Sequence, residues 1–439
     1  MLEDRRAVGM KFFPKNISGW EWLYPGMGVK RWLLLLVLGV TCVGLGFAYL
    51  LVNIYRQQSL PAFFYYLTLQ FISRLARAAL FGGLGLAAVI IAVVQLSRSL
   101  LAPFLRPGQE VAKAVYQYRQ RERGPKVVAI GGGTGLSTLL RGLKEYTSNI
   151  TAIVTVADDG GSSGRLRREL GVLPPGDFRN CIAALADAES LTTQLFQYRF
   201  SQGNGLDGHS FGNLFIAAMA DVTGSFERAI LESSRVLAVQ GRILPSTLDN
   251  VTLCADLRGE DEAAGTLSRV KGESSITAAE LPIERVFLQP ERVRAYPGAI
   301  RAILEADLIV AGPGSLFTSV LPNLIVEDIT KAIRASRALK IYVCNVATQK
   351  GETDGFSVGD HVKALQRHVG RDVFPYVLAN DNFNVELNPT TELVPLEYNN
   401  QGDYQVIAAD LIDLQIPWRH DPQKLARCLM DFYEKRAKG

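Results

Sequence analysis

Five short apolar runs, rich in valine and isoleucine, recur from residue 126 onward and alternate with amphipathic segments. They are "KVVAI", "ITAIVTVA", "ADLIVAG", "LKIYVCNVA" and "FPYVLAN". Continuous apolar strands separated by helices are typical of a parallel sheet that is covered on both faces. The sequence therefore predicts an α/β fold, Rossmann-like, with a mainly parallel sheet and helices on both faces. Because ligands of such sheets bind at the carboxyl ends of the strands, the residues after each run are the candidates for a site.

Two charge-free runs precede this region and are too long to be strands. Residues 32–52 and 78–96 are each long enough to cross a hydrocarbon core of about 30 Å as a helix. We therefore predict a membrane anchor over residues 1–105, a basic linker over 106–125 and one large domain over 126–439. The middle of the linker is predicted to be a short helix, which either lies on anionic headgroups or is a plain solvated connection.

Charge is divided unevenly between these parts. The first 126 residues carry 16 Lys and Arg against five acids, whereas the remainder carries 31 Lys and Arg against 38 acids. The acidic domain disfavours nucleic-acid binding, which needs basic surface. Only Arg56, Arg74 and Arg77 lie between the two apolar runs, so the positive-inside bias predicts a hairpin with both termini and the main domain in the cytoplasm. The five scattered cysteines are expected to be small buried hydrophobes in a reducing compartment.

The first strand leads into a glycine-rich bend, "GGGTGLSTLLRGL" at residues 131–143. A dinucleotide fingerprint would need glycine where Leu136 stands, and no Gly-Lys-Ser/Thr completes a Walker loop. Backbone N–H groups before a helix remain, and they favour an anion. "GPGS" after a later strand repeats this arrangement, and two such bends on one sheet edge suit a diphosphate. The candidates are Gly131, Gly132, Gly133, Thr134 and Gly135 in the first bend and Gly312, Gly314 and Ser315 in the second.

Polar residues after the other strands extend the candidate site. Asp158 and Asp159 could hold a divalent cation such as magnesium, pair with nearby arginines, or accept sugar hydroxyls. Asp177 is either a ligand contact or only a helix cap, His209 either lines the site or is structural, and Arg419 either meets a phosphate or is a surface arginine beside a cap. The remaining candidates are Ser162, Ser163, Arg165, Asn180, Asn213 and Asn345.

Seven ordered motifs carry a resemblance to a known family. They are "AIGGGTGLSTLLRGLK", "VTVADDGGSSGRLRREL", "LPPGDFRNCIAALAD", "GHSFGNLFIAAM", "ADLIVAGPGSLFTSVLPNL", "IYVCNVATQKGETDGF" and "RHDPQKLA". From about Gly124 to the C-terminus the chain resembles the gluconeogenesis-factor family of YvcK type, which is related to the 2-phospho-L-lactate transferase CofD. The membrane hairpin departs from the usual soluble member.

The resemblance implies a domain that binds a nucleotide sugar, typically UDP-N-acetylglucosamine, and that acts in carbon-source-dependent control of cell-wall growth and cell shape. The related CofD branch implies instead a transferase that moves a phospholactyl group from a nucleotide-activated donor to a deazaflavin. The "DDGGSSGRLR" and "TQKGETDG" forms favour the gluconeogenesis-factor branch. We therefore expect binding and regulation before catalysis and assign no catalytic residue. A homo-oligomer and partners in cell-wall synthesis or its regulation stay open.

Overall fold

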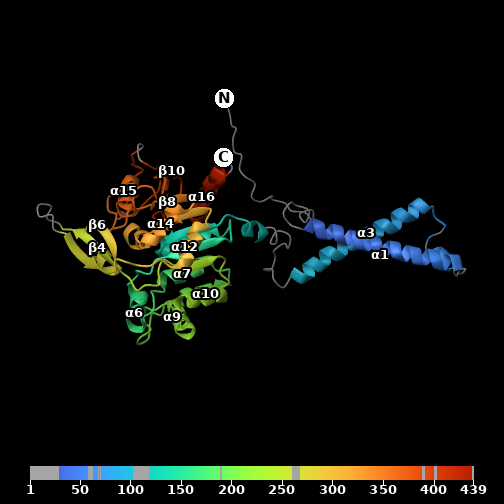
Figure 1. Ribbon diagram of the computed structural model, residues 1–439, viewed down its shortest axis with the longest axis horizontal. Helices are drawn as coiled ribbons and strands as arrows, with labels where there is room; N and C mark the ends of the chain where they lie inside the picture. Colours follow the sequence, from blue (N-terminus) through green and yellow to red (C-terminus); the bar gives the residue numbers. More distant parts are fainter. Residues whose placement is uncertain are drawn as a thin grey trace, which may run out of the picture. The chain divides into compact units, whose positions relative to one another are not determined.

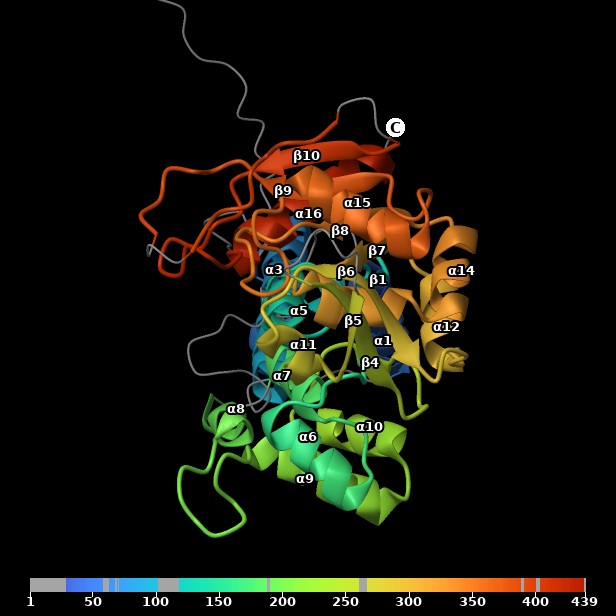
Figure 2. The ribbon, with the colours of Figure 1, turned by 90° about the vertical axis from the view of Figure 1, so that its left-hand side faces the viewer.

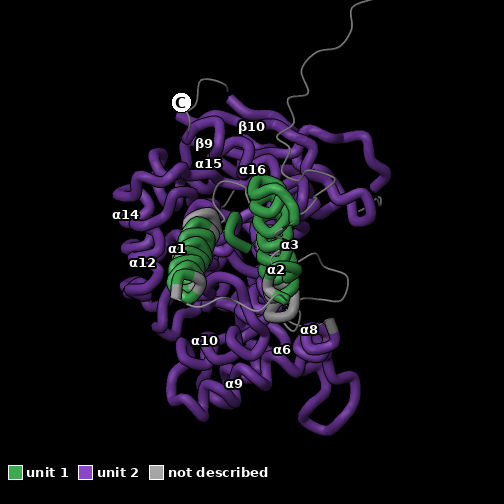
Figure 3. The backbone as a smooth tube through the Cα atoms, turned by 90° about the vertical axis from the view of Figure 1, so that its right-hand side faces the viewer, with its two compact units in different colours: residues 1–120 green, residues 121–439 purple. Residues whose placement is uncertain are grey.

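A computed structural model describes most of the 439-residue chain. The described residues are 29–57, 63–67, 69, 71–101, 118–187, 190–259, 267–387, 391–399 and 403–437. Two compact units divide the chain, residues 1–120 and 121–439 (Figure 3). Most of the linker predicted over residues 106–125 lies outside the described residues.

The described part of the first unit is helical (Figure 1). Its elements are α1 (Val29–Gln57), α2 (Phe63–Leu67) and α3 (Arg74–Leu101). The windows Leu36–Ile54 and Arg74–Gln95 have mean hydropathies of 2.0 and 2.2, and no part of either is buried. By length and composition both long helices are able to cross a membrane. Each extends beyond its predicted apolar run at both ends.

The second unit is built on a seven-stranded sheet in which all neighbouring strands are parallel. The order is β10-β9-β8-β7-β1-β2-β3. The strands are β1 (Val127–Gly131), β2 (Ile150–Val154), β3 (Arg242–Pro245), β7 (Leu308–Ala311), β8 (Leu339–Val343), β9 (Tyr376–Asn380) and β10 (Gln405–Ala409). All five predicted strands are members of this sheet, so the predicted fold class is confirmed.

The strand order reverses beside β1. The chain builds outward from β1 to β2 and β3, and then continues on the other side of β1 with β7, so that Val127 pairs with both Ile150 and Leu308. In doubly wound sheets a crevice opens at such a switch point, because the loops that leave the two central strands turn to opposite faces. The topology therefore places the candidate site above β1 and β7.

Helices cover both faces of the sheet. Figure 2 shows α5 and α7 on one side of the central strands and α12 and α14 on the other. The residues Leu136, Leu139, Leu140 and Leu143 recur at helical spacing on α5 and are fully buried, which fixes that helix on the core. The helices of this unit are α5 (Gly133–Leu143), α6 (Gly161–Leu170), α7 (Gly176–Leu185), α8 (Ser190–Gln197), α9 (Phe211–Thr223), α10 (Phe226–Val236), α11 (Glu273–Ala278), α12 (Pro297–Leu304), the π-helical turn η3 (Leu316–Val320), α13 (Leu321–Leu324), α14 (Glu327–Ala335), α15 (Val358–Val369) and α16 (Pro422–Ala437).

A second, smaller sheet was not predicted. It is antiparallel in the order β5-β4-β6, with β4 (Thr252–Arg258), β5 (Leu267–Lys271) and β6 (Ile283–Gln289). The helix α11 follows β5 directly, after Gly272. This connection matters for function because it brings Glu273, the first residue of α11, to the cavity described next.

Candidate functional site

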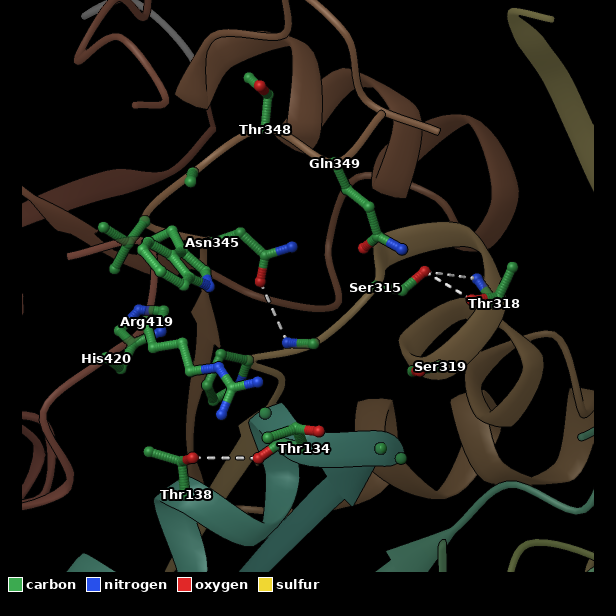
Figure 4. A pocket seen from close by; sticks show the side chains of 18 of the residues that line it. Thr134, Thr138, Ser315, Thr318, Ser319, Asn345, Thr348, Gln349, Arg419 and His420 are labelled. Carbon is green, nitrogen blue, oxygen red and sulfur yellow. Dashed lines mark hydrogen bonds between the residues drawn. The ribbon is translucent and has the colours of Figure 1, made fainter. Parts of the chain in front are cut away.

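A cavity of about 540 Å³ opens at the carboxyl ends of β1 and β7, at the switch point of the sheet (Figure 4). Its volume lies within the range of about 300–1,000 Å³ that is usual for small-molecule sites. Its wall consists of segments after β1 (132–135), β7 (313–315) and β8 (345–350), the segment before α16 (418–420), and the single residues Thr138, Glu273, Thr318, Ser319 and Thr391. Loops far apart in the sequence thus enclose one space.

The first bend, residues 131–135, leads directly into α5. The helix begins at Gly133, earlier than the predicted start near Leu136, and Gly133 adopts a φ of +61° that favours glycine. The N–H of Gly133 is donated to the Asp177 carboxylate. The N–H groups of Thr134 and Gly135 belong to the first turn, which has no acceptors within the helix. Both residues line the cavity, so the positive end of α5 faces it.

The second bend, residues 312–315, lies against the first. A side chain at Gly135 would come within 2.6 Å of the Pro313 carbonyl carbon and 2.7 Å of the Gly314 Cα. The two bends are therefore neighbours, as the diphosphate hypothesis requires. However, Gly314 donates its N–H to Asn345 Oδ1 at 3.1 Å, and Gly312 donates its N–H to the Ile130 carbonyl at 2.9 Å. Contrary to expectation, these two amides serve the protein, and Gly131 and Gly312 do not line the cavity.

Ser315 also has an internal role. Its hydroxyl is hydrogen-bonded to Glu352, and its oxygen accepts the N–H of Thr318 at 3.1 Å, which caps η3 (Figure 4). Thr318 Oγ1 and Gln349 Nε2 donate to the same carboxyl of Glu352, at 3.2 and 2.9 Å. The Ser315 hydroxyl was expected to contact an anion. In the structure it fixes the second bend to the loop after β8, while Ser315 still belongs to the cavity wall, so the anion contact stays a prediction.

The cavity wall contains two cationic side chains, Arg419 and Lys350, of which Lys350 is paired with Glu280. Figure 4 shows the guanidinium of Arg419 extending between Asn345 and the Thr134–Thr138 turn of α5. The side chain is exposed and makes no ion pair with any residue in the described part of the chain. Its charge, after burial, lowers the pKa of the neighbouring Arg141. Asp421 caps α16 by accepting the N–H of Lys424 at 2.8 Å, so Arg419 precedes a fixed helix start and is free to bind an anion.

Buried acidic groups lie near Glu273 and behind the first bend. Burial, together with the charge of Asp158, raises the pKa of Asp177 to about 7. Burial and the charges of Asp158 and Asp177 raise the pKa of Glu273 to about 9. The pKa of Asp158 is also raised, mainly by burial, although it accepts the N–H of Gly160 at 2.8 Å. Several carboxyl groups therefore share one region with few compensating cations.

This arrangement predicts a pH-dependent cost to stability. An unfolded glutamate ionises near pH 4.5, whereas folded Glu273 holds its proton until about pH 9, so unfolding releases a proton between these values and stability falls as pH rises. Glu273→Gln removes this contribution. In differential scanning fluorimetry, we expect the difference in melting temperature between the variant and the wild type to shift in favour of the variant as pH rises from 7 to 9. A difference that stays constant over this range would contradict the assignment.

Several predicted site residues do not line this cavity. Ser162 Oγ is hydrogen-bonded to His209 Nδ1 at 2.9 Å and accepts from Asn213 Nδ2 at 3.1 Å, in a buried network that joins α6 to α9. Arg165 donates to the Asp207 carbonyl at 2.6 Å, and Asn180 accepts from Arg179 at 2.9 Å. These contacts hold the surrounding loops together, these side chains lie outside the cavity wall, and their role in ligand binding stays a prediction.

Three further candidates support the wall from behind. Asp177 is not a helix cap, since Pro175 occupies that position in α7, and it holds the first bend through the Gly133 N–H. Ser163 Oγ accepts the N–H of Gly176 at 3.0 Å, next to Asp158. Asp159 accepts the N–H of Ser274 at 2.9 Å and thereby anchors α11. Asn345, in contrast, lines the cavity itself.

Sequence reasoning missed Glu273, Glu352 and Trp418. Glu273 follows a glycine at the start of a short helix, where an acid ordinarily signals only a favourable helix N-terminus. Glu352 lay within the quoted "TQKGETDG", but nothing in the sequence indicates that it is buried. Trp418, 44% exposed, lines the cavity directly before Arg419 and could have been considered with it.

Metal ligation receives no geometric support here. Among the residues that the structure describes, no group of three or more His, Cys, Asp or Glu side chains is placed to hold a metal ion. The four described cysteines of the second unit are free, and three of them are buried. A magnesium ion at Asp158 and Asp159 stays a prediction.

The fold and the cavity define a Rossmann-like α/β protein with a cavity at the switch point of its sheet. The profile of the family described as "2-phospho-L-lactate transferase CofD" matches residues 127–412. The chain belongs to this family.

Within this family, the chain is similar to proteins that are named as gluconeogenesis factors. A protein of Nostoc sp. named "Putative gluconeogenesis factor" is 45% identical over 95% of this chain and 93% of its own length. The "Gluconeogenesis factor" of Bacillus subtilis is 46% identical over 71% of this chain and 99% of its own length. A crystal structure of a UPF0052-family protein from Bacillus halodurans superposes with a TM-score of 0.64 and 44% identity, over 70% of this chain and 99% of that one. These matches confirm the family resemblance carried by the seven motifs.

Proposed function

We propose that this protein binds a nucleotide sugar of the UDP-N-acetylglucosamine type and regulates cell-wall synthesis and cell shape in response to carbon metabolism. The observation that carries the proposal is one cavity that is lined by Thr134 and Gly135, in the first turn of α5, and by Arg419, which makes no ion pair within the described residues. Helix N-termini and guanidinium groups are the usual protein partners of a diphosphate. Trp418 offers an exposed aromatic face for a base.

Isothermal titration calorimetry with UDP-N-acetylglucosamine, with and without magnesium, tests the proposal. Residues 121–439 form a compact unit and are a suitable sample. The gluconeogenesis factor of Bacillus subtilis and the crystallised Bacillus halodurans protein each match about 70% of this chain over 99% of their own length. Proteins of about this size therefore exist without the remaining part of the chain. We expect a saturable signal that UDP reduces by competition. The absence of heat with every UDP-sugar, in both magnesium conditions, would refute the proposal.

A second candidate function is transfer of a phospholactyl group to a deazaflavin. The description of the matching family is the observation that favours it. Incubation with a nucleotide-activated phospholactate and a deazaflavin acceptor, followed by chromatography of the products, distinguishes the two functions. Turnover would support the transferase, whereas sugar binding without turnover would support the regulator.

We further propose that the helical hairpin tethers this domain to the cytoplasmic face of a membrane. The proposal rests on the apolar lengths of α1 and α3 and on the sparse basic residues between them. A green fluorescent protein fused after Gly439 is expected to fluoresce in a membrane fraction, and alkaline phosphatase at the same position is expected to be inactive. The reverse pattern would refute the orientation, and recovery of the fusion only in the soluble fraction would refute the tether.

A further inference from the structure

The cavity is surrounded by charged groups of both signs. Arg419 lies near another cation, Arg141, and its wall segment precedes α16. Glu273 enters from α11, and the groups that act on its charge are Asp158, Asp177, Asp159 and Glu352. None of these five carboxyl groups makes an ion pair in the part of the chain that the structure describes. These five carboxyl groups form an acidic side of the cavity at Glu273, whereas the cations of the wall, Arg419 and Lys350, come from other segments and Lys350 is already paired with Glu280.

Glu273 is the member of the acidic side that reaches the cavity. It belongs to the wall, whereas Asp158, Asp159, Asp177 and Glu352 do not. Its Oε2 is buried and has no hydrogen-bond partner. A buried polar atom without a hydrogen-bond partner lowers the stability of the protein, because it has lost its hydrogen bonds to water and gained none in return. A ligand in the cavity is therefore the natural partner of this oxygen.

The backbone holds Glu273 firmly at this position. The next residue, Ser274, donates its N–H to Asp159 Oδ1 at 2.9 Å, and the N–H of Ile276 is donated to the Gly272 carbonyl at 3.0 Å. Asp159 in turn follows Asp158 at the end of the segment after β2. The Glu273 side chain is consequently presented from a helix start that backbone hydrogen bonds hold in place.

We infer that Glu273 is a specificity residue that admits nucleotide diphosphates joined to an uncharged, hydroxyl-bearing sugar and rejects those that carry a carboxylate on the sugar. This inference rests on the proposed function and narrows its ligand class. A hydroxyl can either donate to or accept from the Glu273 carboxyl, so it is satisfied in both protonation states. A carboxylate can only accept, and it meets the field of the surrounding acids.

A matched ligand pair tests the inference on the full-length chain in detergent. UDP-N-acetylglucosamine and UDP-N-acetylglucosaminuronate differ only at C6, where a hydroxymethyl replaces a carboxylate. At pH 8 we expect the neutral sugar to bind about tenfold or more tightly, as measured by calorimetry. Because Glu273 ionises as pH rises through about 9, the ratio of the two affinities should widen between pH 8 and pH 10. Effects of pH on the shared nucleotide cancel in the ratio.

Variants separate a specificity role from a structural one. In Glu273→Gln the neutral sugar should still bind, because the amide keeps hydrogen-bonding capacity, and the affinity ratio should no longer change with pH. Glu273→Ala should weaken the neutral sugar. Glu327→Gln changes an exposed acid that is paired with Lys331, and it should behave as the wild type.

Each outcome is decisive. Equal affinities for the two ligands, or a ratio that widens identically in wild type and Glu273→Gln, would overturn this inference while leaving nucleotide-sugar binding intact. Failure of both ligands to bind the wild type would overturn the inference and the proposed function together.

Discussion

Gly135→Ala is expected to lower the affinity for a UDP-sugar by about tenfold or more and to destabilise the second unit. An alanine in place of glycine ordinarily stabilises a helix by about 1 kcal/mol. Here the new Cβ would lie within 2.6 Å of the Pro313 carbonyl carbon, which is backbone and cannot rotate away. Overpacking of this kind costs about 1–3 kcal/mol, so the clash outweighs the gain in helix propensity. The two bends would move apart, and the amides of the first would lose their position.

Gly131→Ala supplies the matched comparison. It lies in the same bend, but its added Cβ would have only ordinary contacts, the nearest being Leu136 Cβ at 3.7 Å. Calorimetry and thermal melting of both variants should therefore separate steric contact between the bends from a general intolerance of alanine. If Gly135→Ala has the same UDP-sugar affinity and melting temperature as the wild type, the close approach of the two bends is not needed for ligand binding or for stability.

Arg419→Ala is expected to reduce UDP-sugar affinity by about ten- to a hundredfold with little change in melting temperature. Hydrogen bonds to a charged group contribute about 1.5–3 kcal/mol, which corresponds to that range. Stability should change little because the exposed guanidinium makes no ion pair in the described part of the chain. Removing the Arg419 charge also removes its electrostatic repulsion of Arg141, which favours the folded state slightly. Calorimetry with UDP and with UDP-N-acetylglucosamine measures the effect.

Two companion variants sharpen the result. Arg419→Lys keeps the charge but loses the planar fork, so an intermediate affinity is expected if the guanidinium makes a bidentate contact. Arg427→Ala removes an exposed arginine from α16 and should leave affinity unchanged. An equal loss in Arg419→Ala and Arg427→Ala would show that only the overall charge matters.

The parallel sheet could be predicted from the sequence because its central strands are buried on both faces and consequently read as continuous apolar runs. Two outer strands escaped this criterion. β3 is the four-residue "RILP", and β10 occupies a sheet edge where only some side chains need to be apolar. The antiparallel sheet was missed since it mixes apolar and charged positions, with Arg269 and Arg285 both bound to Asp256.

The cavity was predictable only in outline. Glycines after a strand mark a bend, and the topology of a doubly wound sheet brings such bends together, so their proximity follows from the sequence. The sequence does not show which backbone N–H groups of the bends are already hydrogen-bonded within the protein. The Gly314 N–H is taken by Asn345, and the Ser315 hydroxyl by Glu352, because loops from β8 pack against the second bend. Such pairings depend on three-dimensional packing between segments that no local pattern encodes.

The pairing of β1 with β7 has a consequence for protein synthesis. The two bends are separated by more than half of the domain, yet neither encloses the cavity without the other. A nascent chain that has emerged only as far as β6 holds β1, β2 and β3 but lacks the second bend, β8 and Arg419. Such non-local pairings form late, since the intervening loop must first be closed. A ligand present during translation would therefore stabilise only completed chains, which couples the yield of folded protein to the supply of that ligand.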